Sequence, residues 1–189
     1  MPDVSAMAAV TQDAGALLYV DAVHLAPHGL VDRAAMGADL VACSPYKFFG
    51  PHCGALAGTP ELLGSLRPAK LVPSSDSVPE RFELGTLPYE LLAGVTAAVD
   101  VLAGIVPGEG SRRERLAASM AAVGRHELAI RQRLESELAA LPGATLHSGS
   151  ARRTPTLLVT FDGHDTKAVS RHLADRGVNA PAGHFYALE

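Results

Sequence analysis

The stretch DLVACSPYKFFGPH, residues 39–52, joins a short apolar run to a turn that carries a lysine. A similar run, ALLYVD over residues 16–21, lies upstream and ends on Asp21. Residues 30–36, between the two runs, predict one or two helical turns that end at Gly37. Strand, crossover and strand in this order predict a βαβ unit with buried parallel strands, and therefore an α/β fold.

The two predicted strands place polar residues at one edge of the sheet. Crossovers of this kind are normally right-handed, so both strands end at the same edge. Asp21 follows the first strand, and residues 44–47 follow the second. Because open α/β sheets bind ligands beyond the carboxyl ends of their strands, the sequence predicts a site here before any motif is considered.

Further helices and strands are predicted on both sides of this unit. Residues 2–14 predict a helix, residues 54–58 predict a third strand, and residues 62–79 contain enough Pro and Ser to predict a surface loop. A long helical region begins near Pro88. Its second half opens with SRRE at residues 111–114, a capping box in which the serine and the glutamate satisfy free helical N–H groups.

The second half of this helical region predicts one apolar face packed in a core. Its apolar residues recur at steps of three and four, with one step of seven. They are Leu116, Met120, Val123, Ile130, Leu134, Leu138 and Leu141. Residues 156–161 then predict a strand, residues 165–176 a helix that Gly177 ends, and a last strand begins near Val178. We expect a smaller α/β domain that starts near residue 125.

Composition excludes several classes of function. The chain has 16 basic and 20 acidic residues, a net charge of −4, and its arginines are scattered, so nothing indicates nucleic-acid binding. No apolar run approaches the roughly 20 residues of a membrane span, and the N-terminus does not resemble a signal peptide. We therefore expect a cytoplasmic protein that does not bind membranes. Cys43 and Cys53 lack the spacing of a zinc site and are expected to be small buried hydrophobes, not a disulfide.

Lys47 is the strongest candidate for chemistry. It is one of three lysines in the chain and lies among apolar residues directly after a strand. Removal from water disfavours an ammonium ion, which prepares an amine to form a Schiff base with an aldehyde cofactor. Asp21, at the end of the neighbouring strand, could pair with a pyridine nitrogen of such a cofactor. Taken from the residues alone, a structural lysine and a turn-forming aspartate remain open alternatives.

Three blocks, at residues 19–24, 42–51 and 81–86, resemble successive blocks of class V aminotransferases and cysteine desulfurases. The resemblance implies pyridoxal 5'-phosphate (PLP) as cofactor, a small amino acid as substrate and a homodimer with shared active sites. It also implies fold type I, a large mixed sheet sandwiched by helices and followed by a small α/β domain. Residues 1–124 would then be part of the PLP-binding large domain with its connecting helix, and residues 125–189 part of the small C-terminal domain.

The same resemblance assigns roles to single residues. Lys47 would form the Schiff base and later move protons at the substrate α-carbon. Asp21 would pair with the pyridinium nitrogen, and His24 would lie near the phenolic oxygen of the ring. Read without the resemblance, His24 is a histidine in a loop. His24 and His28 are spaced like zinc ligands on a helix, but Pro27 argues against a helix, so no metal is expected.

Three further residues would contact the cofactor phosphate. The resemblance places the hydroxyl of Ser44 and the side chain of Tyr46, at a position that is often His, near the phosphate of the same subunit. It places Thr86 at the phosphate that the other subunit binds. The alternatives are a serine that ends a strand, a packed tyrosine and a threonine that caps a helix.

Two departures from the family pattern bear on the reaction. Tyr186 stands where cysteine desulfurases carry the cysteine that accepts sulfur, and a phenol cannot replace a thiolate. Pro181 stands where many of them have an arginine, while Cys43 and Cys53 lie in the wrong domain to substitute. Persulfide chemistry is therefore not expected, and transamination, racemisation and β-elimination remain open.

The family pattern also extends beyond both ends of this chain. The side chain that stacks on the PLP ring would lie upstream of Met1, and the arginine that binds the substrate carboxylate would lie after Glu189. We therefore expect a fragment with little activity of its own. The alternatives are a catalytically silent remnant or interaction module of the same fold, and an α/β protein that does not bind PLP.

Overall fold

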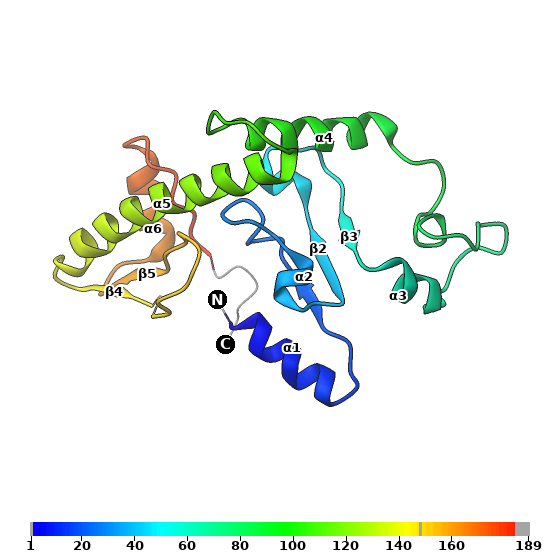
Figure 1. The fold of residues 1–189 in the computed structure, drawn as a ribbon. Helices are drawn as coiled ribbons and strands as arrows, with labels where there is room; N and C mark the ends of the chain where they lie inside the picture. Colours follow the sequence, from blue (N-terminus) through cyan, green and yellow to red (C-terminus); the bar gives the residue numbers. More distant parts are fainter. Residues whose placement is uncertain (1, 148, 184–189) are drawn as a thin grey trace. The chain divides into compact units, whose positions relative to one another are not determined.

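The computed structural model describes residues 2–147 and 149–183. The chain divides into two compact units, Met1–His126 and Glu127–Glu189 (Figure 1). The second unit begins two residues after the start of the small domain expected from the sequence. The assignment of the two parts to a PLP-binding domain and a small C-terminal domain stays a prediction. No helix among the described residues is long and apolar enough to cross a membrane.

A three-stranded sheet forms the centre of the first unit. Its strands are β1 (Tyr19–Asp21), β2 (Leu40–Cys43) and β3 (Ala55–Ala57), in the order β1-β2-β3. β1 pairs with β2 in parallel, with Asp21 opposite Ala42, and β3 pairs with β2 antiparallel. The predicted parallel strand pair is therefore confirmed, and the carboxyl ends of β1 and β2 lie side by side.

Two capped helices flank the parallel strands. Asp3 accepts a hydrogen bond from the amide of Ala6 at the start of α1 (Val4–Asp13), and Asp32 accepts one from Ala35 at the start of α2 (Arg33–Met36). Gly37 ends α2 in the left-handed conformation, φ 68°, where a β-carbon would lie 2.9 Å from that of Ala8. A glycine is required here because α1 and α2 approach closely. Ala8, Leu18, Ala22, Ala38 and Val41 form the buried core.

The segment after β3 is only partly the loop that its composition predicts. Helix α3 covers Pro60–Ser65, with Thr59 as its cap, because a threonine before a proline is a strong helix start. The expectation of a loop from residue 62 is wrong for this first turn. The following irregular segment is tied by Arg81, in the 3-10 helix η2 (Glu80–Phe82), which donates to the carbonyl groups of Gly64, Leu66 and Asp76.

Two long helices follow in the chain, of which the second continues beyond the boundary of the first unit at His126. They are α4 (Tyr89–Ala103) and α5 (Arg112–Ala139). The predicted capping box is confirmed: the Glu114 carboxylate accepts from the amide of Ser111 at 2.8 Å, and the Ser111 hydroxyl accepts from the amide of Glu114 at 3.2 Å. A second core of Phe48, Leu102 and Met120 joins α4 and α5 to the segment after β2.

The predicted apolar face of α5 is buried only in part. Met120 is 4% exposed and Leu116 packs beside it, as expected. Ile130, Leu134 and Leu141, by contrast, are 47%, 48% and 50% exposed. The prediction is wrong for this second half, since a periodic pattern identifies an apolar face but not whether a neighbour covers it.

The second unit contains a two-stranded antiparallel sheet and a helix. Its elements are β4 (Ala144–Leu146), β5 (Val159–Phe161) and α6 (Thr166–Ala174), and Asp165 caps α6. Strand β4 was not predicted. The strand expected from Val178 is absent from residues 178–183, and Tyr186 lies outside the described residues. The buried Arg131 donates to the carbonyl group of Arg153, and Glu135 pairs with Arg153.

Candidate functional site

The backbone around Lys47 forms a tight turn that directly follows β2. Ser44 precedes the 3-10 helix η1 (Pro45–Phe48), and its carbonyl group accepts from the amide of Lys47 at 2.9 Å. The amide of Gly50 then donates to the carbonyl group of Pro45 at 2.9 Å. A β-carbon on Gly50 would lie 2.9 Å from the Pro45 side chain, so this turn needs a glycine. The backbone of Lys47 is therefore held between two hydrogen bonds.

Asp21 lies at the same edge of the sheet, one strand away. The amide of Ala22 donates to the carbonyl group of Ala42 at 2.8 Å, which continues the parallel ladder to the end of β1. The Asp21 carboxylate accepts from the amide of Val23 at 2.9 Å. This bond fixes the carboxylate in the loop beyond the strand, where its side chain is exposed.

His24 is close enough to Lys47 for their charges to interact. Partial burial lowers the pKa of His24, and the positive charges of His28 and Lys47 lower it further. The rings of His24 and His28 meet edge to face, with centroids 5.5 Å apart. The loop after β1 thus carries an imidazole, and the turn after β2 an amine, at adjacent strand ends.

Tyr46 contacts Lys47 and also His52, a residue that the sequence analysis did not single out. The phenol ring stacks on the His52 ring, with centroids 4.9 Å apart and an angle of 14° between the planes. The Nζ atom of Lys47 lies 5.4 Å from the centre of the same phenol ring. Tyr46 is 45% exposed, so it is not a packed core tyrosine. The Gly50-Pro51 turn that returns His52 to Tyr46 is visible in the sequence, but the stack is not.

Lys47 is exposed, contrary to the expected removal from water. The apolar residues that follow it divide between two environments: Phe48 is 8% exposed and packs inward, while Phe49 is 84% exposed. A short 3-10 turn points successive side chains in different directions, so apolar neighbours in sequence do not bury the lysine. Within this chain, the side chain of Lys47 is open to solvent.

The remaining residues predicted for the site are less closely associated with Lys47 and Asp21. Ser44 is half-buried at the end of β2. Thr86 is exposed in the loop between η2 and α4, and within the described ranges no hydrogen bond joins it to Lys47 or Asp21. The contact of Thr86 with a cofactor phosphate stays a prediction. Pro181 is exposed in irregular structure of the second unit.

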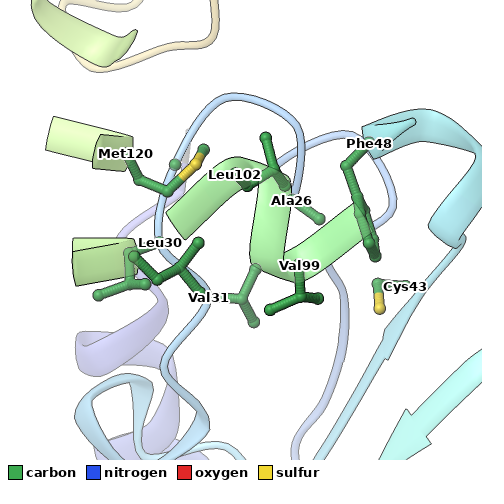
Figure 2. Close-up of a pocket in the computed structure, with 10 residues that line it drawn as sticks. Ala26, Leu30, Val31, Cys43, Phe48, Val99, Leu102 and Met120 are labelled. Carbon is green, nitrogen blue, oxygen red and sulfur yellow. The ribbon is translucent and has the colours of Figure 1, made fainter. Parts of the chain in front are cut away.

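An apolar pocket of about 130 Å³ lies behind the Lys47 turn. Figure 2 shows Phe48 and Cys43 on one side of it and Leu30 and Met120 on the other. Burial raises the pKa of the Cys43 thiol, and nearby Cys53 raises it further. Both cysteines are free and half-buried, so they are neither fully buried hydrophobes nor a disulfide. The lining is apolar apart from the Cys43 thiol, whereas Asp21, His24 and Lys47 are exposed on the solvent side.

The polar groups on that side fit a pyridine aldehyde in part. An aldehyde requires an amine, which Lys47 supplies, and a protonated ring nitrogen requires a carboxylate, which Asp21 supplies. Lys47 and His24 also offer cationic or hydrogen-bonding groups, whereas the predicted phosphate ligand Thr86 is not gathered with them. Among the described residues, no group of three His, Cys, Asp or Glu side chains could hold a metal ion.

Comparisons with known proteins identify the family to which this chain belongs. The model of the aminotransferase class V family matches residues 1–188. The chain is 34% identical over 184 residues to the uncharacterized protein MT3887 of Mycobacterium tuberculosis, covering 95% of this chain and 46% of that protein. It is 37% identical over 111 residues to a probable cysteine desulfurase of Streptomyces coelicolor, covering 52% of this chain and 27% of that protein.

A solved structure shows the same fold. The apo cysteine desulfurase of Thermococcus onnurineus matches with a TM-score of 0.81 at 22% identity, over 98% of this chain and 46% of that one. The chain thus spans less than half the length of these relatives. Members of the family use PLP, are generally homodimeric and act on small amino acids. The chain belongs to the aminotransferase class V family and has the α/β fold of its PLP-dependent enzymes.

Proposed function

We propose that this chain is the lysine-bearing part of a PLP-dependent enzyme that acts on a small amino acid through a Schiff base at Lys47. One observation carries the proposal: Asp21 is the last residue of β1 and Lys47 follows the adjacent parallel strand β2, at the edge where such sheets bind ligands. Family membership supports the cofactor. We also propose that the active site is completed in a homodimer and that the enzyme is cytoplasmic.

Each residue at this edge has a distinct task in the proposal. The Lys47 amine holds the cofactor aldehyde and afterwards takes or returns a proton at the substrate α-carbon. The Asp21 carboxylate holds a proton on the ring nitrogen, and His24 binds beside the phenolic oxygen. When bound, the cofactor withdraws electrons from the substrate α-carbon. Ser44, Tyr46 and, from a second subunit, Thr86 bind the phosphate.

The reaction in this proposal is not persulfide transfer. Tyr186 occupies the sequence position at which a sulfur-accepting cysteine is expected, and a phenol does not form a persulfide. Transamination, racemisation and β-elimination proceed without a sulfur-accepting thiolate. We propose that the enzyme performs a reaction of this group.

The exposure of Lys47 favours one competing proposal. A remnant or interaction module that kept the fold without the cofactor would leave this lysine in solvent, as it is here. In an enzyme, further polypeptide of the family fold would cover Lys47. The two proposals differ in whether Lys47 reacts with PLP more readily than an ordinary exposed lysine.

An absorbance titration separates them. PLP is added to the wild type, to Lys47→Ala and to Lys167→Ala, followed by borohydride, and the visible band and its reduction are recorded. Lys167 is exposed on α6 and is the matched control. The enzyme proposal requires a saturable band that Lys47→Ala loses and Lys167→Ala keeps. Equal loss in both variants, or no band in any of the three proteins, would favour the silent module.

A further inference from the structure

The phenol ring of Tyr46 is shared by two neighbours in the turn. The His52 ring stacks on it at 4.9 Å and 14°, and the Nζ atom of Lys47 lies 5.4 Å from its centre. A cation within about 6 Å of a ring centre is attracted to the face of that ring. The orientation of the Tyr46 ring therefore affects where the Lys47 amine lies.

The core does not hold the Tyr46 ring in place. The ring is 45% exposed, whereas the neighbouring Pro45 and Phe48 side chains are buried and anchor the turn. Without a neighbour, an exposed tyrosine on such a turn would exchange between rotamers. Among the described residues, the ring of His52 stacks on the Tyr46 ring and so favours one Tyr46 rotamer.

The backbone fixes His52 for this purpose. The Gly50 amide bonds to the Pro45 carbonyl group, and the Cys53 amide bonds to the Pro51 carbonyl group at 3.0 Å. These bonds fold the chain back, so that a residue six positions after Tyr46 reaches its ring. His52 itself is exposed and has no place in the core.

We propose that His52 is a positioning residue: by stacking on Tyr46, it holds the phenol ring against Lys47 and so orients the amine. Its role in the reaction rests on the function proposed above for Lys47. The positioning itself does not require the cofactor, because all three side chains belong to one short turn.

Nuclear magnetic resonance tests the positioning without the cofactor. Reductive methylation with ¹³C-formaldehyde labels the three lysines of the chain, Lys47, Lys70 and Lys167. Each Lys→Ala variant assigns one signal. Methyl groups on Lys47 Nζ lie near the Tyr46 ring, so its ring current displaces their signal, and Tyr46→Leu defines the undisplaced position.

The variants of His52 then decide the proposal. We expect His52→Ala to move the Lys47 signal toward its position in Tyr46→Leu, and His52→Phe, which keeps an aromatic stack, to retain the displacement. His126→Ala, a change at an exposed histidine on α5, is the matched control and leaves the signal unchanged. An unchanged Lys47 signal in His52→Ala would overturn the proposal, as would an equal movement in His52→Phe.

The same variants also separate this inference from the proposed function. In unmethylated protein, we expect His52→Ala to slow the reaction of Lys47 with PLP and His52→Phe to restore it. If Lys47 proves unreactive in every protein, the function fails while the methyl signals still report the positioning. If Lys47 reacts equally fast in His52→Ala and in the wild type, the proposed link between positioning and reactivity is refuted.

Discussion

Replacing Gly50 by alanine tests the architecture of the Lys47 turn. A β-carbon at Gly50 would lie 2.9 Å from Cβ and 3.0 Å from the carbonyl oxygen of Pro45. Pro45 is fully buried, and ring and backbone atoms cannot move aside at little cost. Overpacking of this kind costs about 1 to 3 kcal/mol. We therefore expect the free energy of unfolding of Gly50→Ala to fall by that amount.

Gly54→Ala supplies the control for this prediction. Gly54 is also a glycine near the start of β3, but a β-carbon there would meet nothing within 4 Å. Loss of chain entropy in the unfolded state should leave this variant unchanged or more stable by up to about 1 kcal/mol. Urea denaturation followed by circular dichroism measures both variants. Equal midpoints for Gly50→Ala and Gly54→Ala would refute the close packing inferred for the turn.

Two further outcomes concern stability. Met120→Ala should lower the free energy of unfolding by about 2 to 5 kcal/mol, because Met120 is 4% exposed in the second core. Leu134→Ala, at a 48% exposed position of α5, should change the free energy of unfolding by less than about 1 kcal/mol. Equal losses of stability in Met120→Ala and Leu134→Ala would contradict the exposure described for this helix. Asp32 has a lowered pKa because it accepts from the amide of Ala35 and then pairs with Arg113. The ionised Asp32 stabilises the fold fully above the unfolded-state pKa, and this stabilisation disappears as the pH falls through the lower folded-state pKa. The urea midpoints of the wild type and Asp32→Asn should therefore converge in acid. A difference between the midpoints that does not change with pH would show that Asp32 does not act through its charge.

The sheet edge could be predicted because its signals are local. Two apolar runs, each ending on polar residues, identify the carboxyl ends of β1 and β2. The helical crossover between them, residues 22–39, is long enough to make the strands parallel. Capping residues likewise indicate where a helix starts, as Ser111 and Glu114 do for α5. These features depend on a few residues that are neighbours in sequence, so they form independently of the rest of the fold.

Exposure could not be predicted in the same way. Among the apolar neighbours of Lys47, Pro45 and Phe48 are buried while Phe49 is exposed, because the direction of each side chain depends on the 3-10 geometry of the turn. Ile130 and Leu134 are periodic with Met120, yet whether a helix face is covered depends on distant segments. The stacking of Tyr46 on His52 depends on how the backbone folds back after Gly50, and the presence of a tyrosine and a histidine does not predict this contact.

The central claim is that Lys47 is the residue that binds the cofactor, and mapping the bound cofactor tests it most directly. Wild-type protein is treated with limiting PLP, reduced with borohydride and digested, and mass spectrometry measures the pyridoxyl group on each of the three lysines. We predict that the peptide containing Lys47 carries most of the label, while Lys70 and Lys167, which is exposed as Lys47 is, carry little. An even distribution, or a preference for Lys167, would contradict the claim.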